Sequence, residues 1–323
     1  MLSLGSAHRH LVIVLCTLFT VAAHAGMPQQ KTQVAGWYRF MLGDFEITAL
    51  YDGYIDLDTA VLQHVKKDEI ARGLSRAFLP AGDKMEGSVN AFLVNTGNEL
   101  VLIDSGTGKV FGPTLGFVLQ NLKAAGYDPA KIDKVLITHM HGDHLGGILT
   151  PEGKIAYPNA QIQTCQLESN YWLDEAQLAK APKDRQDSFR MAQSTSAPYR
   201  ASGQWKPFAP NAQIVPGIRA LAGGHTPGHS SYLVESKGQR MIVLGDVIHF
   251  GPVQFARPEI SVAFDVDEHA AIAARRELFA QAAKDRTLLA GAHLSFPGVG
   301  HIRVSGEGYE WVPAGFSPIR SDR

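Results

Sequence analysis

The sequence contains few cysteines and no excess of charge of either sign. Its 323 residues include two cysteines, and 30 basic against 31 acidic residues give a formal net charge of -1. No basic stripe and no acidic tail interrupts this balance. We therefore do not expect a nucleic-acid substrate, because the affinity for a phosphate backbone depends on clustered Lys and Arg side chains.

The N-terminal segment has the pattern of an export signal that is removed from the mature protein. A His-Arg-His tripeptide precedes an apolar run over residues 11–23, and Ala23-His24-Ala25 supplies small residues for cleavage. The apolar run is too short to span a bilayer, and no later segment approaches the required length, so we expect no membrane span in the mature form. The predicted organisation is a signal peptide at 1–25 and a single periplasmic or secreted domain at 26–323. Cleavage leaves Cys165 alone, which excludes an internal disulfide.

The pattern of apolar residues predicts an alternation of strands and helices. In the first half, strands are expected at 37–41, 45–50, 89–94, 100–103 and 134–137, with a helix over 114–125. In the second half, strands are expected at 218–222, 231–235, 241–244 and 287–290, with a helix over 268–283. Residues 167–197 are polar and helical, and we interpret them as an insertion lying over the functional site. Two similar halves predict an α/β fold, an αββα sandwich of two mixed sheets with outer helices.

Four residues that can bind metal lie within six positions directly after a predicted strand. They are His139, His141, Asp143 and His144. Alternation along an extended backbone directs His139 and His141 to the same side, toward one ion, while Asp143 and His144 leave the turn and can serve a second ion. Imidazole nitrogen and carboxylate oxygen are ligands that zinc accepts readily when thiolates are absent. A surface or core position is the ordinary role of a single histidine, but it does not explain this cluster.

Further candidate ligands follow other predicted strands. They are His225 and His229 in a tight turn, Asp246 after an apolar strand, and His293 after the next. Asp246 has two oxygens and is the natural bridge between two ions. His229 is at least as well explained as a hydrogen-bond partner of a ligand, and a Gly-Asp turn is in itself ordinary loop chemistry.

This pattern resembles the metallo-β-lactamase superfamily, and within it the methyl parathion hydrolase group. The similarity covers essentially the whole mature chain and includes segments 43–50, 111–116 and 293–298. The resemblance implies that one ion is held by His139, His141 and His225 and the other by Asp143, His144 and His293, with Asp246 between them. It also implies a possible homodimer, since members of the group are dimers.

The resemblance assigns further residues around the metals. Asp104 matches a position that supports the ligand loop without binding metal, and His229 is not carried over as a ligand. The aromatic residues Phe111, Trp172 and Phe189 match positions that line the substrate pocket. Ordinary core packing explains these three side chains equally well, because aromatic residues bury well anywhere.

The expected chemistry is hydrolysis of a small neutral ester or lactone with two divalent metal ions, for which zinc is the first choice. Zinc lowers the pKa of bound water to roughly 7, so a metal-bridging hydroxide would serve as nucleophile without a side-chain base. A lactone's alkoxide leaving group needs a proton, and Asp143 or Asp246 are the candidate catalytic groups to deliver it.

One departure from the methyl parathion hydrolase pattern concerns the substrate. The third residue after the bridging Asp is apolar in that group, whereas here it is His249. A polar side chain beside the metals favours a flat lactone or aryl ester over a bulky phosphotriester. Phe264 narrows the expected pocket further, with an ordinary core position as the equally good alternative. Phosphotriester hydrolysis, as of methyl parathion, is expected as a secondary activity.

Other functions on the same fold remain open at this point. A β-lactamase commonly has Arg where this chain has His144 and Cys or Ser where it has Asp246, and a glutathione thioesterase needs a basic patch that the last third lacks. A mononuclear iron oxygenase uses the same ligand types, so metal content must separate it from a hydrolase. A binding module without catalysis would normally have lost a ligand, and here every expected position is filled.

Overall fold

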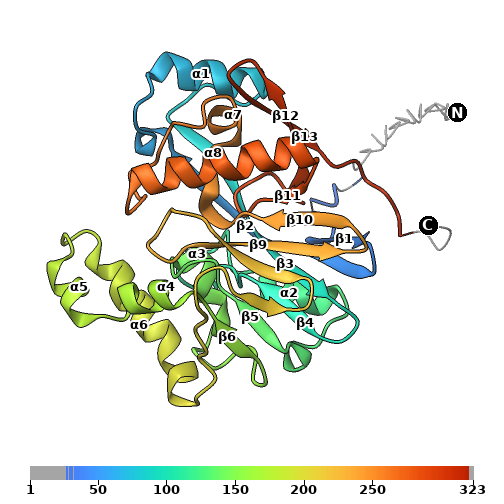
Figure 1. Cartoon of the computed structure of the whole chain (residues 1–323), viewed down its shortest axis with the longest axis vertical. Coiled ribbons are helices and arrows are strands. Elements are labelled where there is room, and N and C mark those ends of the chain that lie inside the picture. The colour runs from blue at the N-terminus through green and yellow to red at the C-terminus, as the bar shows by residue number, and fades with distance from the viewer. Residues whose placement is uncertain (1–26, 28, 32, 320–323) are drawn as a thin grey trace, which may run out of the picture. The chain divides into compact units, whose positions relative to one another are not determined.

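Two mixed β-sheets pack face to face in the structure, a computed structural model that describes residues 27, 29–31 and 33–319 (Figure 1). The first sheet has the order β1-β2-β3-β4-β5-β6 and the second the order β13-β12-β11-β10-β9-β8-β7. The strands of the first sheet are β1 (Trp37–Leu42), β2 (Phe45–Asp58), β3 (Lys84–Asn95), β4 (Leu100–Ile103), β5 (Lys134–Leu136) and β6 (Gln161–Gln163). Those of the second are β7 (Gln213–Val215), β8 (Ile218–Ala222), β9 (Ser230–Ser236), β10 (Gln239–Val243), β11 (Leu288–Ala290), β12 (Val299–Ser305) and β13 (Gly308–Pro313).

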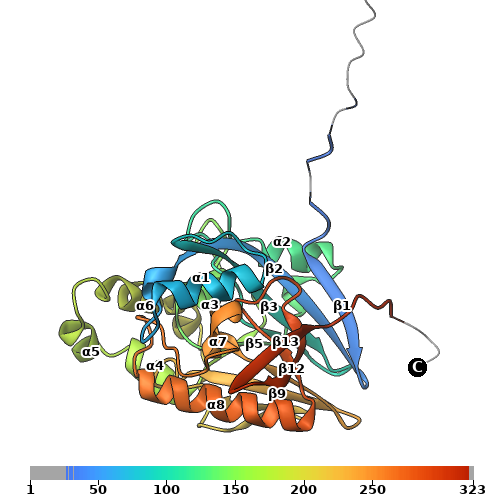
Figure 2. The same ribbon diagram turned by 90° about the horizontal axis from the view of Figure 1, so that it is seen from above.

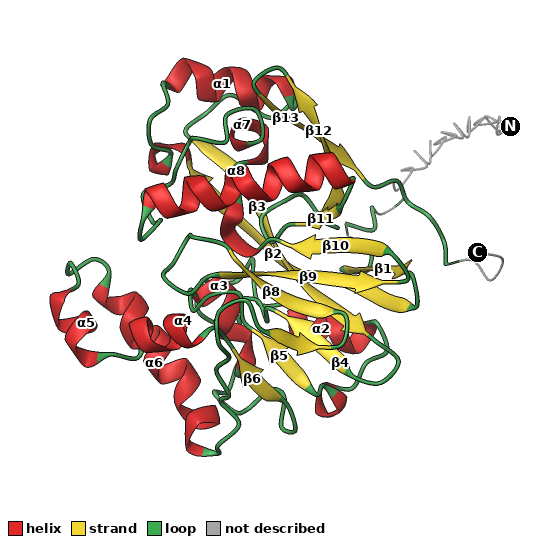
Figure 3. Cartoon of the chain, in the orientation of Figure 1, coloured by secondary structure: helices red, strands yellow, loops and turns green. Residues whose placement is uncertain are grey.

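Helices cover the outer faces of both sheets (Figure 3). They are α1 (Lys67–Arg76), α2 (Val118–Ala124), α3 (Gly142–Leu145), α4 (Gln166–Trp172), α5 (Glu175–Lys180), α6 (Gln186–Ala201), α7 (Gly251–Gln254) and α8 (Glu268–Asp285). Short 3₁₀ turns occupy Thr59–Val61, Pro129–Lys131, Gly146–Ile148 and Gly245–Val247. Figure 2 shows α2 and α8 on opposite sides of the strands. The predicted αββα sandwich is thereby confirmed.

The hydrophobic core forms layers that follow this arrangement. Between the sheets, Phe92 and Ile103 of the first sheet pack with Tyr232 and Val243 of the second. On the outer face of the second sheet, Phe279 of α8 is part of a separate apolar cluster. Each sheet thus buries both faces, which explains why several strands are apolar throughout their length.

The predicted elements differ from the observed ones mainly in their ends. The strand expected at 45–50 continues to Asp58, because its second half pairs with the start of β3 across an irregularity at Gly53. The helix expected at 114–125 begins only at Val118, since Gly116 has a positive φ of 95° that a helix cannot accommodate. The first half also contains α1, which the pattern of strands did not predict.

The chain divides into two units, residues 1–34 and 35–323, and the sheets and helices that the structure describes belong to the second. The predicted signal peptide at 1–25 lies outside the described residues. Among the helices that the structure describes, none combines the length and the apolar character needed to cross a bilayer.

Parallel pairing sets the position of the site. In the first sheet β4, β5 and β6 run parallel, and in the second β10 and β11 do so. Their carboxyl ends carry the loops that begin after β5, β10 and β11, and these loops contain every candidate ligand except His225, which follows β8. Loops held at the ends of strands on a rigid scaffold are the usual place for functional residues.

Candidate metal centre

The histidine-rich segment after β5 changes from extended chain to a helical turn within a few residues. His141 has extended dihedral angles (φ -71°, ψ 157°) and caps α3, the single turn that contains Asp143 and His144. The extended part directs His139 and His141 toward one group of ligand atoms, and the turn directs the other two residues toward a second group. The local backbone thus distributes four neighbouring residues over two sites.

The first group of ligand atoms comes from His139, His141, His225 and Asp246. His139 Nε2 and His225 Nε2 lie 2.9 Å and 3.2 Å from His141 Nδ1. Asp246 Oδ2 lies 3.4 Å from His139 Nε2 and 3.6 Å from His225 Nε2. Three imidazole nitrogens and one carboxylate oxygen therefore converge on a single point.

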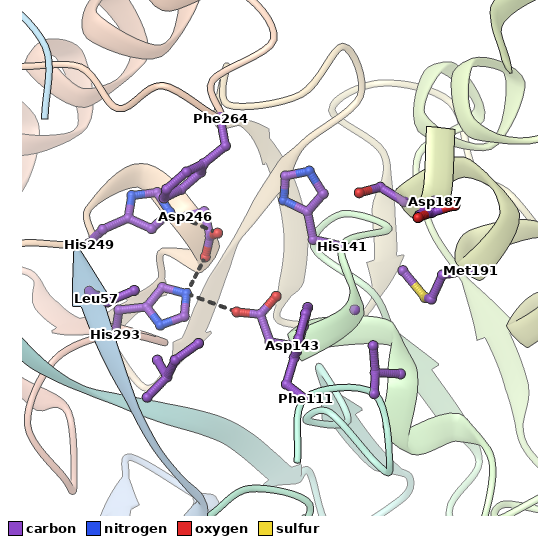
Figure 4. A pocket seen from close by; sticks show the side chains of 14 residues that line it. Leu57, Phe111, His141, Asp143, Asp187, Met191, Asp246, His249, Phe264 and His293 are labelled. Atoms are coloured by element: carbon purple, nitrogen blue, oxygen red, sulfur yellow. Dashed lines mark hydrogen bonds and ion pairs between the residues drawn. The ribbon is translucent and has the colours of Figure 1, made fainter. Parts of the chain in front are cut away.

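The second group comes from Asp143, His144 and His293. His293 Nε2 lies 3.4 Å from Asp143 Oδ2, and His144 Nε2 lies 3.5 Å from the same oxygen. The other oxygen of Asp246, Oδ1, lies 3.0 Å from His144 Nε2 and 3.1 Å from His293 Nε2. Figure 4 shows His293 between the two carboxylates. Asp246 thus faces one group with each of its oxygens.

These donor sets fit divalent metal ions. His144 Nε2 and Asp246 Oδ1 are buried and lie 3.0 Å apart, yet neither forms a hydrogen bond among the described residues. Buried polar atoms without a partner are rare, and nitrogen and oxygen atoms that face one another in this way are typical of metal ligands. The seven residues expected as ligands are all brought together here.

Outer hydrogen bonds fix the orientation of the ligand rings. Asp104 Oδ2 lies 2.8 Å from His144 Nδ1, and its other oxygen accepts the backbone N–H of Thr138 at 2.8 Å. Asp265 Oδ1 lies 2.6 Å from His225 Nδ1. A carboxylate on the far nitrogen fixes the tautomer, so that the other nitrogen faces the metal as a ligand. Asp104 does not belong to either ligand group.

Sequence patterns did not reveal Asp265 or Glu168. Asp265 is 40 residues from the ring it contacts. The buried side chain of Glu168 accepts the backbone N–H of Met140, which is 28 residues away. Both are single carboxylates outside any motif, so no signal of spacing or residue type could have identified them.

His229 takes a supporting position. Its Nε2 accepts the backbone N–H of Asp246 at 2.9 Å, and His229 belongs to none of the ligand groups. We expect His229→Ala to keep both metals and to lower kcat by about 10-100-fold, because outer partners orient ligands without supplying them. Metal analysis together with initial rates would check this. Loss of an ion from the variant would instead make His229 a ligand.

Burial and neighbouring charge set the protonation of the cluster. Burial, aided by His225, lowers the pKa of His141 to about 3, and burial lowers the pKa of His249 to about 4 against the opposing effect of Asp246. Burial also opposes the charged form of His144, but Asp246 and other carboxylates outweigh it and raise its pKa well above the usual value. Burial opposes ionisation of Asp246, yet the surrounding histidines hold its pKa well below the usual value. His141 is therefore neutral near pH 7, as a ligand must be.

A cavity of about 450 Å³ opens directly onto both ligand groups (Figure 4). Three residues expected at the pocket line it, namely Phe111, His249 and Phe264. Further apolar wall comes from Leu57 of β2, and Met191 of α6 closes another side. The helical insertion predicted over the site therefore contributes part of the cavity wall through α6.

Trp172 and Phe189 do not line this cavity, contrary to the expectation from the resemblance. Both are buried in the core, with ring centroids 4.6 Å apart. The indole Nε1 of Trp172 donates to Glu168 Oε1 at 2.6 Å, and its ring lies edge-on to His141. Trp172 therefore packs behind the candidate ligand His141 and does not line the cavity. The alternative of ordinary core packing is the correct one for both residues.

An αββα fold with a His/Asp cluster at the ends of its strands defines a metal-binding α/β protein. Residues 85–293 match the metallo-beta-lactamase superfamily, and the chain belongs to this family. The superfamily prediction is thus confirmed, while membership of the methyl parathion hydrolase group stays a prediction.

Solved structures of the same superfamily cover nearly the whole chain. The hydrolase AbOPH of the beta lactamase superfamily is 38% identical with a TM-score of 0.85, over 89% of this chain and 100% of that one. AidC, a dizinc quorum-quenching lactonase solved with a product, N-hexanoyl-L-homoserine, is 26% identical with a TM-score of 0.81, over 88% and 99% of the two chains.

Among curated proteins, an N-acyl homoserine lactonase from Bacillus sp is 27% identical over 132 residues, or 39% of this chain and 42% of the lactonase. The chain spans between 18% and 42% of the length of the curated relatives it matches. The family and these neighbours support a metal-dependent hydrolase.

Proposed function

We propose that the protein is a dinuclear metal-dependent hydrolase of small neutral esters or lactones. The observation that carries this proposal is the position of Asp246, whose two oxygens face two separate ligand groups at the end of a largely apolar cavity. Two adjacent ligand groups that share a carboxylate and open onto a pocket are typical of hydrolytic metal centres. The lactonase neighbours support lactones as one substrate class.

Separate sets of residues in the chain would hold the two ions. His139, His141 and His225 would hold one ion, Asp143, His144 and His293 the other, and Asp246 both. Divalent ions bound there would supply a water activated near neutral pH and an electrophile for the substrate's carbonyl oxygen. Asp143 and Asp246 line the cavity, so either carboxylate could take the proton that the attacking water releases and pass it to an alkoxide leaving group.

The cavity lining favours neutral substrates over β-lactams and glutathione thioesters. Those alternatives carry carboxylates away from the bond that is cleaved, and a cation usually receives them. The lining includes Asp187 and contains no Lys or Arg. A lactone or aryl ester needs no such cation.

We expect Asp187→Lys to raise kcat/KM for a carboxylate-bearing ester, relative to its uncharged analogue, by at least about threefold, because the change replaces repulsion with attraction. Asp184→Lys is the matched control, since Asp184 is exposed in the same segment but does not line the cavity. Rates for both esters in both variants, at low ionic strength, would check the effect. An equal response in the two variants would place the cavity's selectivity elsewhere.

Metal content and a substrate screen on one sample would test the proposed function. We expect two divalent ions per chain, with hydrolysis of lactones or aryl esters that is lost on chelation and restored by zinc. A single iron per chain, with oxygen consumption, would support the mononuclear oxygenase instead. Faster turnover of β-lactams or thioesters than of any lactone or aryl ester would contradict the proposed substrate class.

A further inference from the structure

Glu168 of α4 is a buried carboxylate that accepts four hydrogen bonds. Its Oε1 accepts the backbone N–H of Met140 at 2.9 Å and the indole N–H of Trp172 at 2.6 Å. Its Oε2 accepts the hydroxyl of Thr226 at 2.7 Å and the backbone N–H of Gly228 at 2.9 Å. The side chain is 0% exposed. All of its strong acceptor positions are therefore used inside the protein.

Three of the four donors to Glu168 belong to the two loops that carry the histidines of the first group. Met140 lies between His139 and His141, and Thr226 directly follows His225. One carboxylate oxygen thus fastens the loop after β5, and the other fastens the loop after β8. Asp246 also contacts both loops, but at the ring nitrogens of His139 and His225, whereas Glu168 holds the backbone of each loop.

Close packing adds to this connection. A Cβ atom at Gly228 would lie 2.1 Å from the backbone nitrogen of Glu168, so only glycine allows the turn to approach α4 this closely. The Trp172 ring, held by the same carboxylate, lies edge-on to the ring of His141 at 5.2 Å between centroids. Glu168 therefore determines where the backbone and one wall of the first ligand group lie.

The second ligand group has different supports. Asp104 holds His144, and the backbone carbonyl of Ser88 lies 3.1 Å from Nδ1 of His293. Glu168 makes no hydrogen bond to either of these among the described residues. Glu168 thus holds the backbone beside the histidines of the first group and contacts neither of the residues that hold the rings of His144 and His293, so a change at Glu168 acts first on the first group.

We propose that Glu168 is a positioning residue that sets the affinity of only one of the two metal sites, the one formed by His139, His141 and His225. This inference rests on the proposed metal centre. Residues that orient ligands from outside typically change metal affinity by about 10-100-fold. Because the two loops come from different halves of the chain, an anchor between them is required to keep three imidazoles within the narrow geometry of one ion.

The sharpest test is Glu168→Gln. The glutamine amide has the shape of the glutamate carboxylate and keeps one acceptor oxygen. Its NH₂ group, however, would face the backbone N–H of Gly228 or of Met140, and two donors cannot form a hydrogen bond with each other. We expect one of the two equivalents of cobalt to bind at least about tenfold more weakly than in the unmodified protein, while the other is unchanged. Excess metal should restore most of kcat.

The matched control is Asp52→Asn. Asp52 is also fully buried and accepts four hydrogen bonds, from the backbone and hydroxyl of Thr107 and from the backbone of Gly116 and Val118. Asp52→Asn therefore replaces the same kind of hydrogen-bonded carboxylate, at a position whose hydrogen-bond donors lie outside the ligand loops. We expect a comparable fall in melting temperature, with both cobalt equivalents binding as before.

Single-site reference variants identify the affected site. The cobalt absorption spectrum of Glu168→Gln at one equivalent should resemble that of His225→Ala, in which the first site is lost, and differ from that of His293→Ala. If Glu168→Gln fails to fold, Thr226→Val removes one donor to the same carboxylate, and we expect a smaller weakening at the same site.

Three results would overturn the inference. The first two are an unchanged cobalt affinity at both sites of Glu168→Gln and an equal weakening of both. The third is a loss of cobalt from Asp52→Asn as large as that from Glu168→Gln, because the effect would then be a general consequence of lower stability. Failure of the unmodified protein to bind two ions would overturn the proposed metal centre itself, and the two failures are therefore distinguishable.

Discussion

Asp246→Ala is expected to lose at least one metal ion per chain and nearly all hydrolytic activity. Its Oδ1 lies near 3 Å from nitrogens of His144 and His293, and its Oδ2 faces His139 and His225. Asp246 offers one carboxylate oxygen to each ligand group, so alanine removes a candidate ligand from each. The activity loss should exceed the roughly 10-100-fold that follows removal of an outer partner.

The measurement is metal stoichiometry on purified protein, together with initial rates for an aryl ester. Asp68→Ala provides a control for the loss of a carboxylate, because its side chain is 64% exposed on α1 and pairs only with Arg72. That variant should keep two ions and normal rates. If Asp246→Ala still bound two ions, the assignment of Asp246 as the shared ligand would be wrong, whatever happened to the rate.

Sequence alone could locate the candidate ligands because they follow strands. The motif from His139 to His144 combines four ligand types within six positions, and His225, Asp246 and His293 come after apolar runs that resemble strands. The physical rule that carboxyl ends of strands meet at one edge then brings distant residues together. The same rule explains why the sandwich itself was predictable.

The supporting residues and the substrate walls could not be predicted in this way. Glu168 and Asp265 act through hydrogen bonds to loops far away in sequence, and such contacts leave no periodicity. Trp172 looks like a pocket residue by resemblance, but its position depends on how α4 turns, and the indole is drawn into the core by its bond to Glu168. Side-chain direction in an insertion is a tertiary property that local patterns do not contain.

The prediction about substrate choice depends on His249, whose ring contacts Asp246, His293 and Phe264. Its Nε2 lies 2.9 Å from Asp246 Oδ2, and since burial lowers its pKa to about 4, the neutral ring donates a hydrogen bond to that carboxylate near pH 7. The ring also lines the cavity, between His293 stacked at 5.2 Å and Phe264 edge-on at 4.8 Å. His249 therefore occupies room beside the metals that a bulky phosphotriester would need.

We expect kcat/KM for an aromatic lactone or aryl ester to exceed that for methyl parathion by at least about tenfold, or roughly 1.4 kcal/mol of transition-state discrimination. A flat carbonyl centre fits between His249 and the opposite wall, whereas a tetrahedral centre with two alkoxy arms needs apolar space on several sides. His249→Leu should shrink the ratio by improving the phosphotriester. Because this change also removes the bond to Asp246, both rates can fall together, and only their ratio tests the argument.

The comparison requires equal metal loading, so metal content is measured on each sample before the rates. His301→Leu is the control for the same substitution on the surface, since His301 is exposed on β12 and outside the cavity. It should leave the ratio unchanged. A preference of the unmodified protein for the phosphotriester would show that His249 does not restrict the cavity. A ratio unaffected by His249→Leu would assign His249 to the support of Asp246 alone, and substrate choice would then have to come from the walls formed by Phe111, Met191 and Phe264.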